Sequence, residues 1–240
     1  MRRTALVTGG GRGIGRAIVA ALAGDARVAA LDLGFPDGPG AAHAAIECDV
    51  RVTKTVGEAV ARVAREGSGI DWIVCAAGIV RDRVSWKMGD AEWAEVLDVN
   101  LSGAFRVARA AAPHLRQSPC GRVVFVSSIN GLRGSFGQAN YAAAKAGLVG
   151  LGRSLAQEFA RDGVTVNVVA PGFIDTEMTR ALPQAVRERA LTRTPLGRTG
   201  QAEEVAALVR FLCGETAGFI TGAVVPIDGG QLLGVGGTEP

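Results

Sequence analysis

The sequence predicts a single α/β domain with a Rossmann-like, doubly wound parallel sheet of seven strands and helices on both faces. Short apolar or β-branched runs alternate with longer helical patterns, which is the order typical of parallel sheets. The short runs are almost continuously apolar, as in strands that helices cover on both sides. The chain has 240 residues, 48% of them hydrophobic, which is enough for one large core. No repeat or linker divides residues 1–240 into two domains.

The predicted elements alternate along the whole chain. Strands are expected at Thr4–Val7, Arg27–Leu31, Ala44–Cys48, Ile70–Cys75, Gly121–Val126, Val164–Val169 and Ala223–Ile227. Helices are expected at 14–23, 53–66, 91–116, 139–161 and 202–213, with ends uncertain by about two to four residues. Helical segments between apolar strands are the crossovers that a parallel sheet requires.

One long irregular region, residues 171–200, interrupts this alternation. It is broken by Pro171, Gly172, Pro183, Pro195 and Gly197. A short helix is expected within it at Gln184–Leu191. A long excursion after the carboxyl end of a strand is typical of a substrate lid. The glycine-rich tail, Gly234–Pro240, is interpreted as either a frayed end or a contact surface.

Composition excludes several classes of partner. The net charge of +3 comes from 26 basic and 23 acidic residues without a run of Lys or Arg, so neither nucleic acid nor a lipid surface is expected to bind. The four cysteines, Cys48, Cys75, Cys120 and Cys213, lack the spacing of metal ligands and are interpreted as reduced core residues. The start, Met1–Val7, is interpreted as a first strand rather than a signal peptide. With no apolar run of membrane-spanning length, the sequence predicts a soluble, cytoplasmic protein without a metal site.

A glycine-rich turn, TGGGRGIG at 8–15, directly follows the first predicted strand and opens the first helix. Gly9 can make the tight turn, Gly13 lets the backbone approach a pyrophosphate, and Gly15 lets the helix pack closely on the strand. The helix N-terminus supplies N–H donors to an anion. This strand–turn–helix context predicts a dinucleotide site rather than a plain loop.

Two acidic positions follow the next strands. Asp32 ends the second strand, 19 residues after Gly13, where a carboxylate accepts hydrogen bonds from ribose hydroxyls and therefore favours NAD over NADP. Arg12 could offset part of the repulsion between Asp32 and a 2′-phosphate. Asp32 could also be an ordinary turn residue before Gly34. Asp49–Val50 is placed either to meet the adenine ring or to form a simple turn.

Tyr141 and Lys145 are four residues apart at the start of a predicted helix, so both project from one face. A phenol ionises near pH 10 in water, and a neighbouring ammonium together with a cationic nicotinamide is expected to lower its pKa. Ser128 follows the strand at Val123–Val126 and lies 13 residues before Tyr141, so it is expected beside the pair. By itself, the pair would fit a partly buried Tyr with a helical Lys nearby.

These pieces together resemble the short-chain dehydrogenase/reductase family from Thr4 to about Leu233. The matching segments are TGGGRGIG at 8–15, the Asp49 turn, AAG at 76–78, DVNLSG with Asn100 at 98–103, SS at 127–128, YAAAK at 141–145 and PGFIDT at 171–176. One departure is Cys75-Ala76-Ala77-Gly78, where the family commonly has two asparagines before AG. A polar bracing contact is therefore expected to be absent or replaced there.

The resemblance implies a catalytic tetrad of Asn100, Ser128, Tyr141 and Lys145. Tyr141 would exchange the hydroxyl proton and Ser128 would bind the substrate oxygen. Lys145 would lower the Tyr141 pKa and bind the nicotinamide ribose, and Asn100 would hold a water that links Lys145 to solvent. The implied cofactor-binding residues are Gly9, Arg12, Gly13, Ile14, Gly15, Asp32, Asp49, Val50, Ala77, Gly78, Tyr141, Lys145, Pro171, Gly172, Ile174 and Thr176, the last two at the carboxamide. The cofactor would supply the hydride.

Within the family, the chain is most similar to 3-oxoacyl-thioester reductases of acyl-carrier-protein or coenzyme A type. The segments are GIVRD at 78–82, GQANYAAAKAGL at 137–148, VTVNVVAPGFIDTEM at 164–178 and Gly121-Arg122. Carrier reductases dock an acidic carrier through basic residues near the site entrance. Arg122 matches one such residue, whereas Asp162, beside Arg161, stands where a second arginine is often found.

Other interpretations remain open at this point. Because Asp32 suits NAD, an NAD-dependent secondary-alcohol or hydroxyacyl-CoA dehydrogenase is the alternative, and a dinucleotide-binding scaffold without turnover is a remote one. Six residues are expected either to line the substrate pocket or to pack in the core: Ser85, Trp86, Asn130, Leu132, Phe136 and Met178. The resemblance also implies a homodimer or homotetramer, formed through the helices at 91–116 and 139–161.

Overall fold

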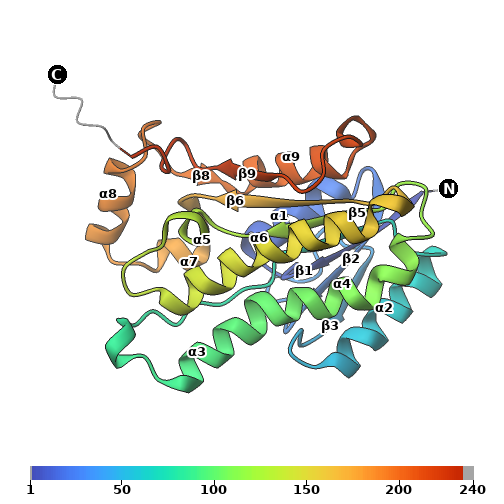
Figure 1. Cartoon of the computed structure of the whole chain (residues 1–240), viewed down its shortest axis with the longest axis horizontal. Coiled ribbons are helices and arrows are strands. Elements are labelled where there is room, and N and C mark those ends of the chain that lie inside the picture. Colours follow the sequence, from blue (N-terminus) through green and yellow to red (C-terminus); the bar gives the residue numbers. More distant parts are fainter. Residues whose placement is uncertain (1, 235–240) are drawn as a thin grey trace.

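A computed structural model describes residues 2–234, which form the parallel sheet that the sequence predicts (Figure 1). The strands are β1 (Arg3–Thr8), β2 (Ala26–Asp32), β3 (Ala44–Glu47), β4 (Trp72–Cys75), β5 (Arg122–Val126), β6 (Thr165–Pro171) and β9 (Val224–Ile227). Their order is β3-β2-β1-β4-β5-β6-β9, and every adjacent pair is parallel. Residues 235–240 of the glycine-rich tail lie outside the described part.

Helices cover both faces of the sheet, as expected for a single doubly wound domain. The helices on one face are α2 (Thr53–Gly67), α4 (Gly103–Leu115) and α6 (Ala139–Phe159), and those on the other are α1 (Gly13–Leu22) and α9 (Ala202–Cys213). Alternate residues of each strand therefore enter different cores. Phe125 of β5 belongs to the α2–α4–α6 side, and Val124 to the α1–α9 side.

The predicted helix at 91–116 differs in one respect. It consists of α3 (Asp90–Leu97), a π-helical turn at Asp98–Ser102, and α4. A π-turn inserts one residue without changing the apolar composition, so periodicity does not reveal it. The turn brings Asn100, which is 1% exposed, inward towards the end of β4.

Two short helices were not expected, and each begins at a hydroxyl cap. Ser128 caps α5 (Ile129–Arg133) by accepting the Asn130 N–H, and Thr176 caps α7 (Glu177–Arg180) by accepting the Thr179 N–H. Each cap satisfies one of the free N–H groups of a first helical turn.

The excursion at 171–200 is tied together at its base. The two-residue strands β7 (Ile174–Asp175) and β8 (Gly200–Gln201) pair in parallel, and α8 (Gln184–Thr192) lies between them, as predicted. Within residues 2–234, no helix is both long enough and apolar enough to cross a membrane.

Candidate active site

A cavity of about 690 Å³ lies along the carboxyl ends of the strands. The chain leaves β1 towards β2 on one side and returns to β4 on the other, and ligands of open α/β sheets bind at such a switch point. All sixteen cofactor positions expected from the sequence line this cavity, and so does Ser128. Asn100 does not line it, although its neighbour Val99 does.

The glycine-rich turn is too crowded for side chains. Gly9 has φ +69°, and a Cβ on it would lie 2.7 Å from the Ala77 nitrogen. A Cβ on Gly15 would lie 2.0 Å from the Gly9 carbonyl oxygen. Within residues 2–234, the N-cap of α1, Arg12, makes no side-chain capping hydrogen bond, and the first turn carries no acidic residue. The first N–H groups of α1 therefore suit a pyrophosphate.

Asp32 is held facing this turn. Its Oδ2 accepts the Gly11 N–H at 2.9 Å, and its Oδ1 accepts the Leu33 N–H at 2.7 Å. The side chain is half-buried and lines the cavity. These two bonds give the carboxylate a fixed position beside the turn, which an ordinary exposed turn residue would lack.

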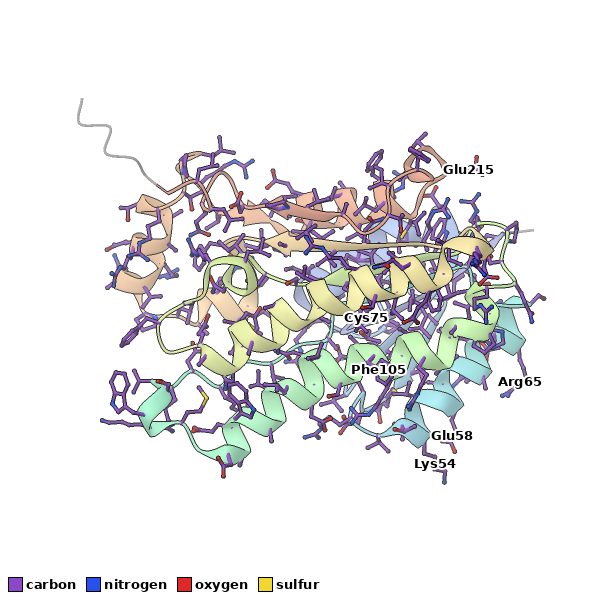
Figure 2. The ribbon with its side chains drawn as sticks, viewed as in Figure 1. Lys54, Glu58, Arg65, Cys75, Phe105 and Glu215 are labelled. Carbon is purple, nitrogen blue, oxygen red and sulfur yellow. The ribbon has the colours of Figure 1, made fainter. Side chains whose placement is uncertain are left out.

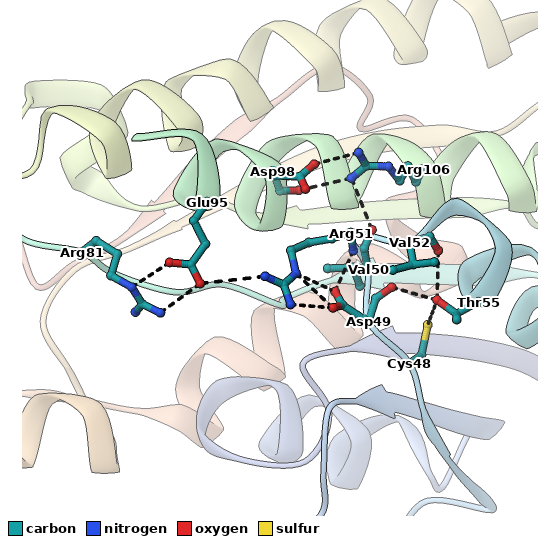
Figure 3. Close-up of polar contacts among 10 residues, drawn as sticks. All are labelled: Cys48, Asp49, Val50, Arg51, Val52, Thr55, Arg81, Glu95, Asp98 and Arg106. Carbon is teal, nitrogen blue, oxygen red and sulfur yellow. Dashed lines mark hydrogen bonds and ion pairs between the residues drawn. The ribbon is translucent and has the colours of Figure 1, made fainter. Parts of the chain in front are cut away.

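An ion-pair chain, which the sequence did not reveal, continues the cavity wall (Figure 3). Arg51 binds both oxygens of Asp49 and lies 3.9 Å from Glu95, which in turn binds Arg81 at 2.8 Å. The Arg51 guanidinium holds the pKa of Asp49 below its usual range. These residues come from three separate loops and helices, so no local sequence pattern connects them. Neighbouring Val50 completes this corner of the wall.

The acid/base residues meet at the opposite end of the cavity. Lys145 Nζ lies 5.6 Å from the centroid of the Tyr141 ring and donates to the Val126 carbonyl at 2.8 Å. Ser127 Oγ donates to the Lys145 carbonyl at 2.7 Å, which fixes α6 against the end of β5. Ser128 lines the same cavity, and its hydroxyl acts to lower the Tyr141 pKa. The structure thus brings together the three side chains that sequence spacing placed on a strand end and a helix start.

Burial opposes the lowering of the Tyr141 pKa that the neighbouring ammonium and a bound nicotinamide are expected to cause. Burial raises the pKa of Tyr141 to about 12, and the charge of Asp82 acts in the same direction, while the hydrogen bond from Ser128 opposes it. Burial also lowers the pKa of Lys145 to about 8. The spacing of Tyr141 and Lys145 indicates the attraction between the two groups, but not the loss of water around both of them on burial.

Asn100 makes both of its hydrogen bonds to one residue. Its Oδ1 accepts the Ile79 N–H at 2.8 Å, and its Nδ2 donates to the Ile79 carbonyl at 2.9 Å. A Cβ on Gly78 would lie 3.4 Å from both Asn100 Oδ1 and Lys145 Nζ, so the two side chains approach the same backbone segment.

Comparisons with known proteins decide the family. Residues 9–231 match a family model described as enoyl-(acyl carrier protein) reductase. The chain is 44% identical to the 3-oxoacyl-[acyl-carrier-protein] reductase MabA of Mycobacterium avium, covering 97% of this chain and 91% of the relative. It is a short-chain dehydrogenase/reductase. The members of this family are nicotinamide-dependent oxidoreductases.

Further similarities agree with this assignment. The acetoacetyl-CoA reductase of Shinella zoogloeoides is 44% identical, covering 97% of this chain and 100% of the relative. The 3-oxoacyl-[acyl-carrier-protein] reductase FabG of Salmonella typhimurium is 42% identical, with coverage of 96% and 98%. A crystal structure titled gox2181 superimposes with a TM-score of 0.92 at 35% identity, covering 97% of this chain and 96% of that one.

A network of polar side chains next to Ser128, outside the cavity lining, has no signature in the sequence. Gln138 donates to both oxygens of Asp82, at 3.0 and 3.1 Å, and accepts a bond from Asn130 at 2.9 Å. The Asn130 N–H in turn donates to Ser128 Oγ at 3.1 Å. Because Ser128 Oγ accepts this bond, its own proton is free to be donated to Tyr141 or to a substrate.

The expected pocket residues divide into two groups. Met178 lines the cavity, whereas Ser85, Trp86, Asn130, Leu132 and Phe136 do not. Trp86 and Phe136 are 74% and 86% exposed. Their segments meet where the Arg83 N–H donates to the Gly137 carbonyl at 2.7 Å.

Cys75 occupies the departure from the usual family motif (Figure 2). It is buried, its thiol donates to the Ala104 carbonyl at 3.9 Å, and burial raises its pKa to about 12. Within the described chain all four cysteines are free thiols; Cys120 is only half-buried, which corrects its interpretation as a core residue. A thiol and a methyl group thus replace the polar contact that asparagines would make.

The expected position of Arg122 near the site entrance is wrong. Arg122 begins β5, at the amino edge of the sheet, and is 6% exposed. Asp162 and Arg161 lie in the turn after α6, also at this edge, where Asp162 pairs with Arg116 at 2.5 Å. The cavity lies at the carboxyl edge, so in a single chain these residues face away from it. The resemblance aligned residues by sequence without showing which edge they occupy.

Proposed function

We propose that this short-chain dehydrogenase/reductase interconverts 3-oxoacyl and 3-hydroxyacyl thioesters with a nicotinamide cofactor. The observation that carries the proposal is the grouping of Ser128, Tyr141 and Lys145 at one end of a cavity that begins at the glycine-rich turn. The names of the three relatives above, two acyl-carrier-protein reductases and one acetoacetyl-CoA reductase, support the substrate class.

The proposed chemistry divides between cofactor and protein. When bound, the reduced nicotinamide supplies a hydride to the keto carbon. Tyr141 donates its phenolic proton to the carbonyl oxygen, so the ketone gains one hydride and one proton and becomes an alcohol. Burial keeps the Tyr141 phenol protonated at neutral pH, so the proton is present for donation in the reductive direction. Ser128 donates a hydrogen bond to the same oxygen and holds it near Tyr141.

Lys145 and Asn100 are proposed as supporting groups. Lys145, anchored on the Val126 carbonyl, would bind the nicotinamide ribose and return a proton to Tyr141. Asn100 lies against the same backbone segment and would hold the water that links Lys145 to solvent. Thr176 and the backbone at Ile174 would bind the carboxamide, since both line the cavity next to the start of α7.

NAD is proposed as the preferred cofactor. The fixed carboxylate of Asp32 faces the turn where the adenosine ribose would lie, and a 2′-phosphate there would bring about two negative charges against it. Arg12 is the one nearby cation in the turn and would offset part of this repulsion. The same carboxylate favours the second candidate, an NAD-dependent dehydrogenase that oxidises a secondary alcohol or hydroxyacyl-CoA.

Three further features belong to this proposal. Residues 171–200 would act as a lid, with the β7–β8 pair as its fixed base. The thioester would be carried by coenzyme A or an acyl carrier protein. A homodimer or homotetramer would form through the helices at 91–116, which are α3 and α4, and at 139–161, which include α6. Phe105 on α4 is 42% exposed, as an interface position would be (Figure 2).

A substrate panel with matched variants tests the function. Acetoacetyl-CoA should be reduced efficiently, while simple ketones and secondary alcohols should turn over far more slowly. Ser128→Ala should lower kcat by about 10²–10³-fold because a donor to the reacting oxygen is lost. Ser135→Ala, an exposed serine of the same loop, is the control and should be unaffected. Preference for simple secondary alcohols would reject the thioester assignment, and an active Ser128→Ala variant would reject the site.

A further inference from the structure

Three buried polar atoms find no hydrogen-bond partner anywhere in residues 2–234. They are the indole Nε1 of Trp72, the guanidinium Nε of Arg122 and the hydroxyl Oγ1 of Thr165. Buried polar groups in folded proteins are almost always hydrogen-bonded, so each exception requires an explanation. These residues are 2%, 6% and 5% exposed, which excludes bulk solvent as the partner.

The three side chains are neighbours in one row across the sheet. Trp72 of β4 is paired with Arg122 of β5, and Arg122 is paired with Thr165 of β6. Paired residues of adjacent strands point to the same face, and the strands lie about 4.8 Å apart. That face is covered by α9, since Trp72 belongs to the same core cluster as Leu212 and Cys213. Arg122 is the middle residue of the row, so each outer residue lies one strand spacing from it, and a small species bound at Arg122 can approach all three side chains.

The charge of Arg122 decides the kind of species. An arginine does not lose its proton in a protein, so burial cannot neutralise it. Across the described residues no carboxylate oxygen lies within ion-pair distance of Arg122, whereas nearby Arg3, which stacks on the Trp72 ring, is paired with Glu215. A buried cation without a counter-charge is strongly unfavourable. A water molecule would complete the hydrogen bonds but would leave this charge uncompensated.

Arg122 contacts the rest of the protein through its two terminal guanidinium nitrogens, Nη1 and Nη2. Its Nη1 donates to the Gly121 carbonyl at 2.8 Å. Its Nη2 lies near Gly218, in the turn that follows the carboxyl end of α9, where carbonyl groups carry partial negative charge. Nε remains available, and it lies in the same row as two further polar atoms. The indole and guanidinium nitrogens can only donate hydrogen bonds, and the Thr165 hydroxyl can donate one as well. A halide ion only accepts hydrogen bonds, so it can be the partner of all three groups.

We propose that Trp72, Arg122 and Thr165 form a buried site for a single halide ion, chloride under ordinary conditions, at the amino edge of the sheet. The ion supplies the counter-charge of Arg122 and joins β4, β5 and β6 at the edge opposite the cofactor cavity. It stabilises the fold and takes no part in hydride transfer.

Thermal unfolding in sodium bromide, sodium chloride and sodium gluconate at equal ionic strength tests the site, since gluconate is too large to enter. At a halide concentration about 100 times the dissociation constant, the midpoint should rise by about 5–10 °C over gluconate. Arg122→Met should abolish this rise, and Trp72→Phe and Thr165→Val should each reduce it. Arg210→Met, which removes an exposed arginine of α9, should retain it. Effects of ionic strength on the unfolding midpoint cancel when the midpoint in gluconate is subtracted from the midpoint in halide for each variant.

A crystal grown in bromide gives the direct result. The proposal expects an anomalous peak within hydrogen-bonding distance of Arg122 Nε, absent from Thr165→Val or much weaker there. If Arg122→Met does not fold, the two other variants still provide the comparison. An ordered water at this position in bromide, or a midpoint that responds to halide equally in all variants, would overturn the proposal.

Discussion

Replacing Asp32 by asparagine is expected to raise the use of NADP relative to NAD by at least about tenfold. The carboxylate carries one negative charge, and a 2′-phosphate carries about 1.5 to 2. At a separation of about 5 Å and an effective dielectric constant between about 20, near a protein surface, and about 80, in water, their repulsion is about 1.2–6.6 kcal/mol. Each 1.4 kcal/mol corresponds to about a tenfold change in relative kcat/KM. Asparagine removes this charge and keeps an oxygen that can accept the Gly11 N–H.

The assay is the ratio of kcat/KM values for NADPH and NADH at a fixed concentration of acetoacetyl-CoA. Asp37→Asn is the matched control, because Asp37 lies five residues further on, is exposed, and pairs with Arg16 outside the cavity lining. The control should leave the ratio unchanged. An unchanged ratio in Asp32→Asn, or a wild-type enzyme that already prefers NADPH, would refute the argument from Asp32.

Two other predictions concern the turn and the phenol. Gly15→Ala should weaken NADH binding by at least about tenfold or prevent folding, because its Cβ would overlap the Gly9 carbonyl. Gly24→Ala, at an open position, should leave the NADH affinity measured by fluorescence titration unchanged. Equal NADH affinities of the two variants would contradict the crowding at Gly15. Tyr141 is the only tyrosine, so ultraviolet absorbance reports its ionisation alone. With a pKa of about 12, the folded protein at pH 10 should be only about 1% phenolate, against half for a free tyrosine. Because the folded state holds this proton more tightly than the unfolded chain, the free energy of unfolding should fall as pH rises above about 10. Half-ionisation at pH 10 or below would contradict the effect of burial.

The sequence predicted the sheet and the cofactor cavity because both depend on local patterns. Seven apolar runs became the seven parallel strands, and the carboxyl ends of those strands lie at one edge by topology alone. The turn at 8–15 and the strand-end residues Asp32, Asp49 and Ser128 were therefore placed together correctly. Tyr141 and Lys145 followed from helical spacing.

What the sequence did not predict depends on contacts between distant segments. The chain from Arg81 through Glu95 to Arg51 joins three elements that no spacing rule connects. The π-turn around Asn100 has no signature in composition. The Tyr141 pKa depends on burial, which a pair of nearby charges in the sequence does not reveal. Arg122 was assigned to the wrong edge because a family motif gives a position along the chain and not a place in space.

The most direct test of Tyr141 as the proton donor is the rate of hydride transfer by a Tyr141→Phe variant, measured in a single turnover with bound NADH and acetoacetyl-CoA. Phenylalanine keeps the ring beside Lys145 and removes only the phenolic hydroxyl, which carries the proton to be donated. NADH should bind with nearly unchanged affinity, and reduction should slow by about 10²–10⁴-fold, the usual loss when a general acid is removed. Reduction at the normal rate would show that the proton comes from another group and that Tyr141 is not the acid.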